Sequence, residues 1–375
     1  MTKKAFIPLS LIPLAGGSLK AIRKTIEGCE VSSQYKMRLY SAFLVGGISK
    51  PFRLAEDFVV NKKSKTITDP AQPLFILGHW RSGTTLLHNL LTQDPDFGYV
   101  TTYQSVFPNV TLSGKWLFKN FMQLAMPDKR PADNVKLSAD FPQEEEFALG
   151  NIHGLSYYNF WYFPDEARNY FSKYLTFEDL NPAEKEYWKA SYKQLVKTAI
   201  LNTKRKNIVL KNPPNTGRID TLLEIYPNAK FIHIMRNPVT VYLSTKRFFE
   251  KTMPALQLNK VEEKRFIENI FWVYEKLMDK YEKDKVLIPE GNLYEFKFED
   301  FEKEPLTFLR KIYTELKIDN FHTAEPHFVN YLNSQKKFKM NKHKVDKESL
   351  DLIMQNMENY CQKYEYNVPD NIEIM

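Results

Sequence analysis

Hydrophobic runs and helical periodicities alternate through the middle of the chain. The apolar run "LFILG" at residues 74–78 is typical of a strand buried on both faces, and "SGTTLLHNLLTQD" after it repeats leucine at helical spacing. The same order returns in "NIVLK" at 207–211, "IDTLLEIY", "KFIHIM" at 230–235 and "VTVYLSTKRFFE". Strands that alternate with helices predict an α/β fold, in which a parallel sheet is flanked by helices and joined by right-handed crossovers.

Helical patterns also occupy both ends of the chain. Apolar residues at helical spacing, as in "YKMRLYSAFLVGGI", predict two or three helices over residues 18–58, and "FVNYLN" and "SLDLIMQNMENYCQKYEY" predict the last helices. The sequence contains no internal repeat and no low-complexity linker. We expect residues 1–72 to form a helical segment packed on the core and residues 73–375 to form the main domain.

The N-terminus partly imitates a signal peptide. "MTKKAFIPLSLIPLAGGSLK" has two lysines, an apolar stretch and then small residues, but Pro8 and Pro13 interrupt the stretch. The stretch is also too short to span a bilayer, so an apolar end that rests on a membrane surface is favoured over secretion. The sequence predicts a cytoplasmic protein and leaves a peripheral membrane contact through the N-terminus open.

The charge balance narrows the choice of partner. The 375 residues carry a formal net charge of +8 and are 43% hydrophobic, a composition typical of a globular protein with a substantial core. The positive surplus suits an anionic partner, either a small phosphorylated ligand or a membrane surface. No nucleic-acid-binding motif is present, so nucleic acid is not predicted. Cys29 and Cys361 have no metal-ligand spacing, no metal is implied, and the oligomeric state is left open.

One loop has the spacing of a phosphate-binding loop. Gly78 and Gly83 are separated as in G-x-x-x-x-G, after a predicted strand and before a predicted helix. Backbone N–H groups at the start of that helix and the hydroxyls of two threonines can bind an anion there. The predicted loop residues are Gly78, Arg81, Ser82, Gly83, Thr84 and Thr85.

The loop lacks the lysine that follows the second glycine in the P-loop of nucleoside triphosphatases. Thr84 takes that position, and the positive charge lies earlier, at Arg81. Arginine can bind two oxygens of one phosphate or sulfate group. The loop therefore suits a terminal phosphate-like group rather than a triphosphate with magnesium.

A second anion site is predicted at "MRNPVTVYLS". Arg236 follows a predicted strand, Asn237 is suited to cap the next helix, and Pro238 is suited to its first turn. Ser244 lies about two turns further on. Arg236 and Ser244 can then share one phosphate at the carboxyl edge of the sheet.

"GHWRSGTTLL" followed at a distance by "RNPVTVYLS" resembles the sulfotransferases that use 3′-phosphoadenosine 5′-phosphosulfate (PAPS), in their bacterial and Golgi-like branch. The resemblance runs from about Pro73 to "FKFEDFEKEPLTFLRKIY". It implies that the loop holds the 5′-phosphosulfate, that Arg236 and Ser244 hold the 3′-phosphate, and that Lys211 lies near the transferring group. It also implies a lysine-rich flap over the 3′-phosphate, here "SQKKFKMNKHK" with Lys337 and Lys339.

The acceptor hydroxyl needs a general base. The cytosolic relatives use a histidine that is absent from the matching segment here, "LKNPPNT", whereas Golgi-type and many bacterial relatives use a carboxylate. "PQEEEF" supplies Glu144, favoured as the base, and Glu145 as second choice, in a helix expected to start near Pro142. Crowding of carboxylates is expected to raise one pKa. His153 is the reserve candidate.

The sequence thus predicts an enzyme that transfers a sulfuryl group from PAPS to a hydroxyl. The aromatic stretch "HGLSYYNFWYFPDEARNYF" suits an apolar acceptor such as a lipid, steroid or phenol, but a sugar is also allowed. Two alternatives remain. One is a nucleotide-kinase-like enzyme, and the other is an inactive nucleotide-binding protein at a membrane surface.

Overall fold

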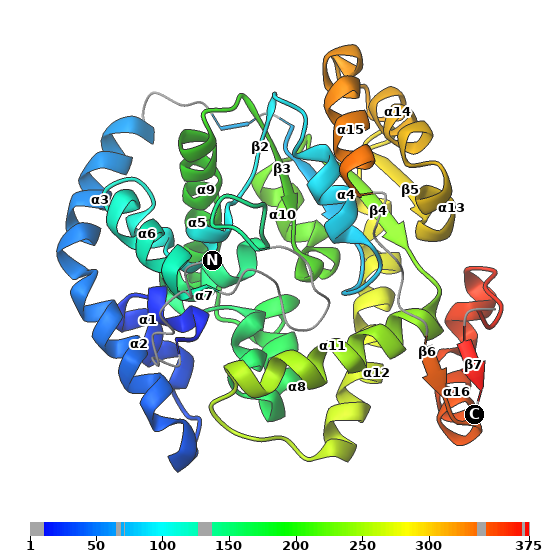
Figure 1. The fold of residues 1–375 in the computed structure, drawn as a ribbon, viewed down its shortest axis with the longest axis horizontal. Coiled ribbons are helices and arrows are strands. Elements are labelled where there is room, and N and C mark those ends of the chain that lie inside the picture. The colour runs from blue at the N-terminus through cyan, green and yellow to red at the C-terminus, as the bar shows by residue number, and fades with distance from the viewer. Residues whose placement is uncertain are drawn as a thin grey trace, which may run out of the picture.

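The computed structural model describes residues 11–64, 69–70, 72–126, 137–335, 343–369 and 372–374. Its centre is a five-stranded parallel sheet of order β2-β3-β1-β4-β5, with β1 in the middle (Figure 1). The strands are β1 Leu74–Leu77, β2 Phe97–Gly98, β3 Asn207–Lys211, β4 Lys230–Met235 and β5 Leu293–Lys297. The predicted parallel α/β architecture is confirmed. A separate two-stranded parallel sheet pairs β6 His343–Val345 with β7 Ile372–Ile374.

Helices surround this sheet. Those before and within its first half are α1 Leu19–Ile26, α2 Lys36–Ile48, α3 Lys50–Ser64, α4 Thr84–Leu91, α5 Thr102–Val106, α6 Lys115–Ala125, α7 Glu145–His153, α8 Ala167–Tyr170 and α9 Pro182–Thr203. Those that follow are α10 Ile219–Ile225, α11 Pro238–Leu256, α12 Glu263–Asp284, α13 Phe298–Lys303, α14 Pro305–Glu315, α15 Phe321–Gln335 and α16 Lys347–Lys363. Within the described ranges, no helix combines the length and the apolar character needed to cross a bilayer.

The central strand β1 is buried on both faces, which explains its continuous apolar run. Leu74 and Ile76 pack with leucines of α4 and with residues of α14 and α15 in one apolar cluster. Phe75 and Leu77 face the opposite way, into a larger cluster that includes residues of α9, α10 and α12. The sheet is therefore the middle layer of three, and the carboxyl ends of β1, β3 and β4 meet at one edge.

The first of the three N-terminal helices, α1, packs against α7. Ser18 caps α1 by accepting a hydrogen bond from the backbone of Ala21 at 3.0 Å, and its own N–H donates to the carbonyl of Asn151 in α7 at 3.1 Å. The Asn151 side chain donates to the carbonyls of Pro13 and Val106. The predicted helices over residues 18–58 are confirmed, while the domain boundary after residue 72 stays a prediction.

Gly83, at the start of α4, offers a test of the local packing. Its φ is +96°, and an added Cβ would lie 2.1 Å from the Phe298 ring. Gly28 also has a positive φ, +74°, but a Cβ added there would meet nothing within 4 Å, so Gly28→Ala isolates backbone strain. We expect Gly28→Ala to lower the free energy of unfolding by about 1 kcal/mol and Gly83→Ala by about 3 kcal/mol or more, measured by urea denaturation. Equal losses would mean that Phe298 moves away without cost.

Candidate active site

The loop between β1 and α4 is held in a conformation that requires its glycines. Gly78 has a φ of +144°, and a Cβ there would lie 2.7 Å from the carbonyl oxygen of Ile234. The N–H of Gly78 donates to the Thr216 hydroxyl at 2.8 Å, and that hydroxyl donates back to the Gly78 carbonyl at 3.2 Å. Arg81 also adopts a positive φ, 68°. The loop is thus shaped by its own backbone and tied to the segment after β3.

The loop opens directly into α4, as the sequence predicts. The first N–H groups of a helix have no acceptor within the helix and lie at the positive end of its dipole, which favours a bound anion. Thr84 is buried in this first turn. Thr85 places its hydroxyl 3.5 Å from the ammonium nitrogen of Lys211. Loop and lysine therefore face the same small volume.

The two predicted anion sites lie against each other. The Arg81 Nε donates to the Ser244 hydroxyl at 3.0 Å, and Arg236 donates from Nη1 to the Arg81 carbonyl at 2.9 Å. The Arg81 guanidinium lies 4.9 Å from the centre of the Phe248 ring. The Arg236 guanidinium similarly lies over Phe298, at 4.5 Å. Residues 163 positions apart in sequence thus form one basic cluster at the sheet edge.

This cluster concentrates positive charge. Burial lowers the pKa of Arg236; the Glu299 carboxylate opposes the shift, and the Arg81 charge adds to it. Two guanidinium groups close together repel each other, and an anion bound between them relieves that repulsion. The predicted helix start is confirmed: Asn237 caps α11 by accepting from the N–H of Val239 at 3.0 Å, and Pro238 is the first helical residue.

Glu144 lies on the side of the loop opposite to Arg236, where it forms an ion pair with Lys211. One carboxylate oxygen pairs with the Lys211 ammonium, and the other accepts a hydrogen bond from the Tyr158 hydroxyl. The indole N–H of Trp80 donates to that same hydroxyl at 3.0 Å. Since Trp80 and Thr85 both belong to the loop and its helix, these contacts form a chain of polar contacts from Trp80 through Tyr158, Glu144 and Lys211 back to Thr85. We call this chain the loop circuit. Lys211 is only 3% exposed and does not face water.

Glu145 points away from the loop into the core. It accepts from the Tyr192 hydroxyl at 3.0 Å and from the Asn215 amide at 3.5 Å, while its second oxygen has no hydrogen-bond partner among the described residues. Burial raises the pKa of Glu145 to about 7, and the Glu144 charge adds to the rise. The pKa rise expected from crowding therefore falls on Glu145 and comes mainly from burial.

Glu146 is fully buried in an ion pair with Arg218. Its two oxygens lie 2.7 and 2.9 Å from the two terminal nitrogens of Arg218. The Asn212 amide and the N–H of Tyr157 also donate to it. Each carboxylate of "EEE" is thus bound by a residue of the segment 211–218. Helix α7 begins at Glu145, with Glu144 as its N-terminal flanking residue, so it starts three residues after Pro142, near which the start was expected.

His153 lies at the other end of α7, roughly 13 Å along the helix from Glu144. Its Nδ1 accepts from the N–H of Leu155 at 3.0 Å, and burial lowers its pKa to about 3. The structure does not bring it to the loop. Lys337 and Lys339 lie outside the described residues.

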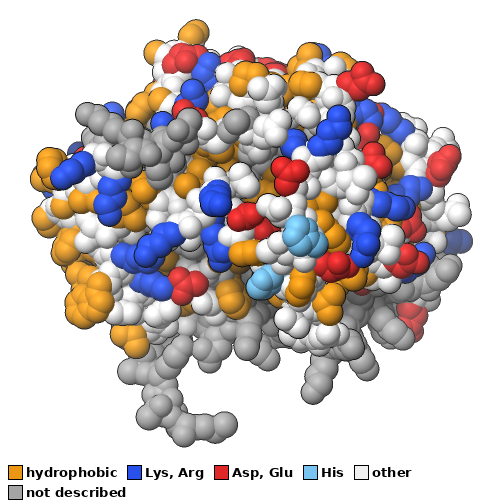
Figure 2. Space-filling view, turned by 90° about the horizontal axis from the view of Figure 1, so that it is seen from above, with side chains coloured by type: hydrophobic (Ala, Val, Ile, Leu, Met, Phe, Trp, Pro, Cys, Tyr) orange, Lys and Arg blue, Asp and Glu red, His pale blue; other side chains and the backbone are white. Residues whose placement is uncertain are grey.

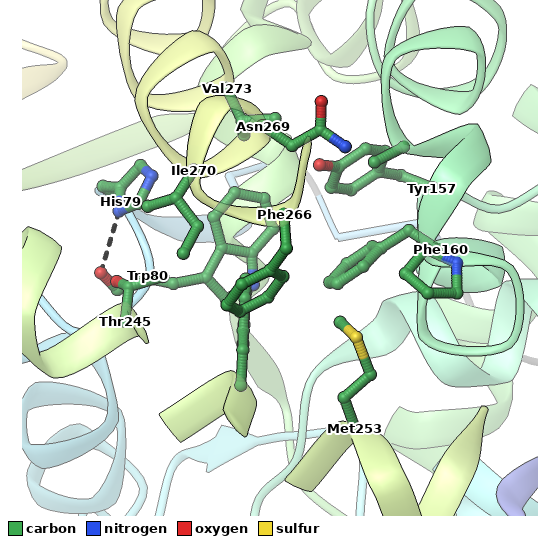
Figure 3. Close-up of a pocket in the computed structure, with 13 residues that line it drawn as sticks. His79, Trp80, Tyr157, Phe160, Thr245, Met253, Phe266, Asn269, Ile270 and Val273 are labelled. Carbon is green, nitrogen blue, oxygen red and sulfur yellow. Dashed lines mark hydrogen bonds between the residues drawn. The ribbon is translucent and has the colours of Figure 1, made fainter. Parts of the chain in front are cut away.

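A partly open apolar cavity adjoins the loop at His79 and Trp80 (Figure 3). Its lining includes Tyr157, Phe160, Thr245, Phe249, Met253, Phe266, Asn269 and Ile270. Three buried polar atoms of this lining have no hydrogen-bond partner among the described residues. They are His79 Nε2, Thr245 Oγ1 and Asn269 Nδ2. The cavity therefore suits an apolar molecule that carries a polar group.

His79 is held as one tautomer. Its Nδ1 lies 2.9 Å from the Trp80 carbonyl oxygen, which can only accept, so Nδ1 carries the proton. Burial lowers the pKa of His79 to about 4, which keeps the ring neutral. Nε2 then presents a lone pair.

Several of these residues cannot be assigned to the site from the sequence alone. Trp80 and Tyr158 look like ordinary aromatic core residues, and the cavity is lined by side chains from four separate parts of the chain. The sequence indicates buried polar contacts in this region only through the run "LKNPPNTGR", which places lysine, asparagine, threonine and arginine at the end of a buried strand and directly after it. Such polar residues need buried partners, which here are the three glutamates and the loop.

The fold and site define a P-loop-like α/β protein with a basic site for an anionic group at the carboxyl edge of its sheet. The chain belongs to the sulfotransferase family, because residues 73–323 match the profile described as "Sulfotransferase family". Omega-hydroxy-beta-dihydromenaquinone-9 sulfotransferase Stf3 of Mycobacterium bovis is 32% identical over 302 residues, which cover 80% of this chain and 76% of that protein. The protein of the same name from Mycobacterium tuberculosis matches equally. The enzyme is a sulfotransferase.

Solved structures agree on the fold. Sulfotransferase STF9 from Mycobacterium avium aligns with a TM-score of 0.71 at 15% identity, covering 92% of this chain and 90% of that one. Sulfotransferase STF1 from Mycobacterium tuberculosis aligns with a TM-score of 0.61, also at 15% identity, covering 90% of each. The kinase-like alternative has no support from these matches.

The buried carboxyl of Glu145 predicts a pH-dependent stability. Its pKa is raised to about 7 in the folded protein from an ordinary 4.5. Between these values the unfolded chain releases the proton while the folded protein keeps it, so stability falls as pH rises through this window. Glu145→Gln mimics the protonated form. Relative to the parent, we expect this variant to gain up to about 3 kcal/mol of unfolding free energy at about pH 8 compared with about pH 4.

Glu224 is a control for which the opposite dependence on pH is expected. Partial burial would raise the pKa of Glu224, but the ammonium groups of Lys189 and Lys185 hold it below its ordinary value. Glu224→Gln should therefore lose a little stability, relative to the parent, at the higher pH. An offset for Glu145→Gln that is equal at both pH values would show that this carboxyl is ionised in the folded protein.

Proposed function

We propose that the enzyme transfers the sulfuryl group of PAPS to the hydroxyl of an apolar, lipid-like acceptor. The observation that carries the proposal is the basic cluster of Arg81, Ser244 and Arg236 beside a glycine loop that opens a helix. Such a cluster can bind two anionic groups of one nucleotide, with the loop on one and Arg236 and Ser244 on the other. PAPS carries its 5′-phosphosulfate and 3′-phosphate on one ribose, which matches two anion sites in contact.

The loop and Lys211 would serve the reacting end of the nucleotide. Sulfuryl transfer is expected to resemble phosphoryl transfer, in which positioning and charge stabilisation supply most of the catalysis. Lys211 is held close to the loop by Glu144 and Thr85 and is nearly inaccessible to water, where its charge acts more strongly. Arg81 can stabilise charge that builds on the leaving oxygen, provided that its side chain turns from Ser244 toward the loop.

Glu144 is the proposed general base. It is the only one of the three consecutive glutamates that bonds to the loop circuit, since Glu145 and Glu146 are bound inside the core. Both Glu144 oxygens already have partners, Lys211 and Tyr158, which fix the carboxylate in place. A base held this way accepts the acceptor's proton without having to reorient first.

His79 is a second candidate for the base. Its unprotonated Nε2 lines the cavity, next to the loop, and has no hydrogen-bond partner among the described residues. Burial makes it a weak base, which is the reason to place it second.

The cavity beside His79 and Trp80 is the proposed acceptor site. Its apolar lining suits a hydrocarbon chain or ring system, and its three polar atoms without a partner in the described part of the chain suit a single polar group. The relative Stf3 is named for a hydroxylated menaquinone, a lipid. Both observations favour an apolar alcohol over a sugar, whose many hydroxyls would find few partners here.

The nucleotide prediction can be tested by binding. The product nucleotide PAP should raise the melting temperature in the presence of EDTA, and ATP with magnesium should raise it much less. Arg236→Ala removes a charge-assisted contact of about 1.5–3 kcal/mol, so the PAP dissociation constant should rise roughly tenfold to a hundredfold. Arg310→Ala, a change at an exposed arginine paired with Glu325, is the control and should leave it unchanged. A preference for ATP with magnesium would contradict the proposal.

The base assignment can be tested by turnover of labelled PAPS with a long-chain primary alcohol. Glu144→Gln keeps the size of the side chain but cannot accept a proton, so kcat should fall about 10²-fold or more while PAP binding is kept. Glu145→Gln and His153→Ala should have mild effects, because neither residue reaches the loop. If Glu144→Gln turns over normally and His79→Asn is inactive, the histidine is the base. Strong PAP binding with no turnover of any acceptor would favour the inactive alternative.

A further inference from the structure

Helices α2 and α3 carry an apolar face that points outward. Six large side chains on this face are between 55% and 72% exposed: Met37, Tyr40, Leu44, Ile48, Leu54 and Phe58. The spacing of three and four residues keeps Met37, Tyr40, Leu44 and Ile48 along one side of α2, and the spacing of four keeps Leu54 and Phe58 along one side of α3. We call this set the outer face.

The outer face is not needed to pack these helices on the protein. The opposite side of α2 is buried through Leu39, Ala42 and Val45, which belong to the main apolar cluster. Helix α6 packs next to α3 through an edge-to-face contact of Phe118 with Phe52, with ring centres 5.3 Å apart. It adds Trp116, which is 80% exposed. So many large apolar side chains exposed on neighbouring helices mark an interaction surface.

Basic residues border the outer face. Of the six lysines and arginines in residues 36–64, Lys36, Lys50, Lys62 and Lys63 are exposed, whereas Arg38 and Arg53 donate hydrogen bonds to backbone carbonyls of the protein itself. The acidic residues of this segment are Glu56 and Asp57. Glu56 is only 4% exposed, because its carboxylate accepts the N–H groups of Leu112 and Ser113. Figure 2 shows hydrophobic side chains interspersed with lysine and arginine on the side of the molecule that carries α3 and α6. Apolar side chains within a basic border match the interior and the headgroups of an anionic bilayer.

We propose that the outer face docks the enzyme on an anionic lipid bilayer. A second copy of the chain fits less well, because a two-fold contact would set the basic border of one copy against the identical border of the other. The bilayer also explains why the face is both apolar and basic. The proposal does not depend on the sulfotransferase reaction, since binding to a bilayer is measured without turnover.

The docking face is connected to the cavity. Arg38, on α2, donates to the carbonyl of Gln257 at 2.8 Å, directly after the end of α11. Phe249 and Met253 of the same α11 line the cavity. If the acceptor is an apolar alcohol, as proposed above, a docked enzyme would hold its acceptor cavity near the membrane in which such an alcohol dissolves.

The test is flotation of the full-length protein with vesicles of phosphatidylcholine containing about 30% phosphatidylglycerol, and with vesicles of phosphatidylcholine alone. We expect binding to the anionic vesicles, weakened by salt. The double variant Leu44→Glu with Phe58→Glu should bind them at least about tenfold more weakly, because it removes two apolar anchors and adds repulsion. The matched control is Val286→Glu with Leu287→Glu, which changes two exposed apolar residues elsewhere and should bind like the parent.

Three results would overturn the proposal. The parent protein fails to bind anionic vesicles, or both double variants bind as the parent does. Alternatively, light scattering shows that the parent is a dimer which only Leu44→Glu with Phe58→Glu dissociates, so that the face is an interface between copies. PAP-induced stabilisation should be the same in the parent and both double variants, which separates loss of docking from loss of the fold or of the nucleotide site.

Discussion

The arrangement of the site depends on one buried ion pair, between Glu146 and Arg218. Both side chains are completely inaccessible to water, so neither charge can be left without the other. Removing one partner of such a pair typically costs about 3–5 kcal/mol, because an uncompensated charge remains in the core. The pair fixes the start of α7 against the segment that follows β3. That segment also fixes the loop, through the paired hydrogen bonds of Thr216 with Gly78. Loop and carboxylate are therefore positioned relative to each other through the segment 211–218, in which this ion pair is fully buried.

The three consecutive glutamates occupy three different environments. Glu146 is held as a carboxylate by Arg218, and the pKa of Glu145 is raised to about 7 by burial. Glu144, at the first position before the helix, pairs with Lys211. Successive helical residues point about 100° apart, so three neighbours in sequence cannot share one environment. The proposed base is the one glutamate that the geometry leaves at the loop.

The sequence allows the three central strands β1, β3 and β4, the loop and both arginines to be predicted because each depends on local pattern. A buried strand followed by glycine and a helix is readable from "LFILG" alone, and so is the capped helix after Arg236. The edge strand Leu293–Lys297 is half exposed and mixes charged with apolar residues, so it lacks that pattern. The circuit through Trp80 and Tyr158 and the cavity between α11 and α12 depend on contacts between distant segments. The same limit applies to the cause of the Glu145 pKa shift, since sequence shows crowding but not burial.

The strand order explains why the proposed reaction site and the proposed nucleotide site lie on opposite sides of the loop. Strand β1 lies between β3 and β4, and the chain leaves it toward one side and later returns to the other. The residues at the ends of these neighbouring strands, Lys211 and Arg236, therefore flank the loop on opposite sides. Lys211 lies with Glu144, where the proposed proton and sulfuryl transfers occur, and Arg236 lies with Ser244, where the nucleotide would be held. Ligands of open parallel sheets bind at such a point because the two crossovers diverge there and leave a crevice. A nucleotide with anionic groups at both ends of its ribose can then span the loop, with its reactive end on the side of the carboxylate.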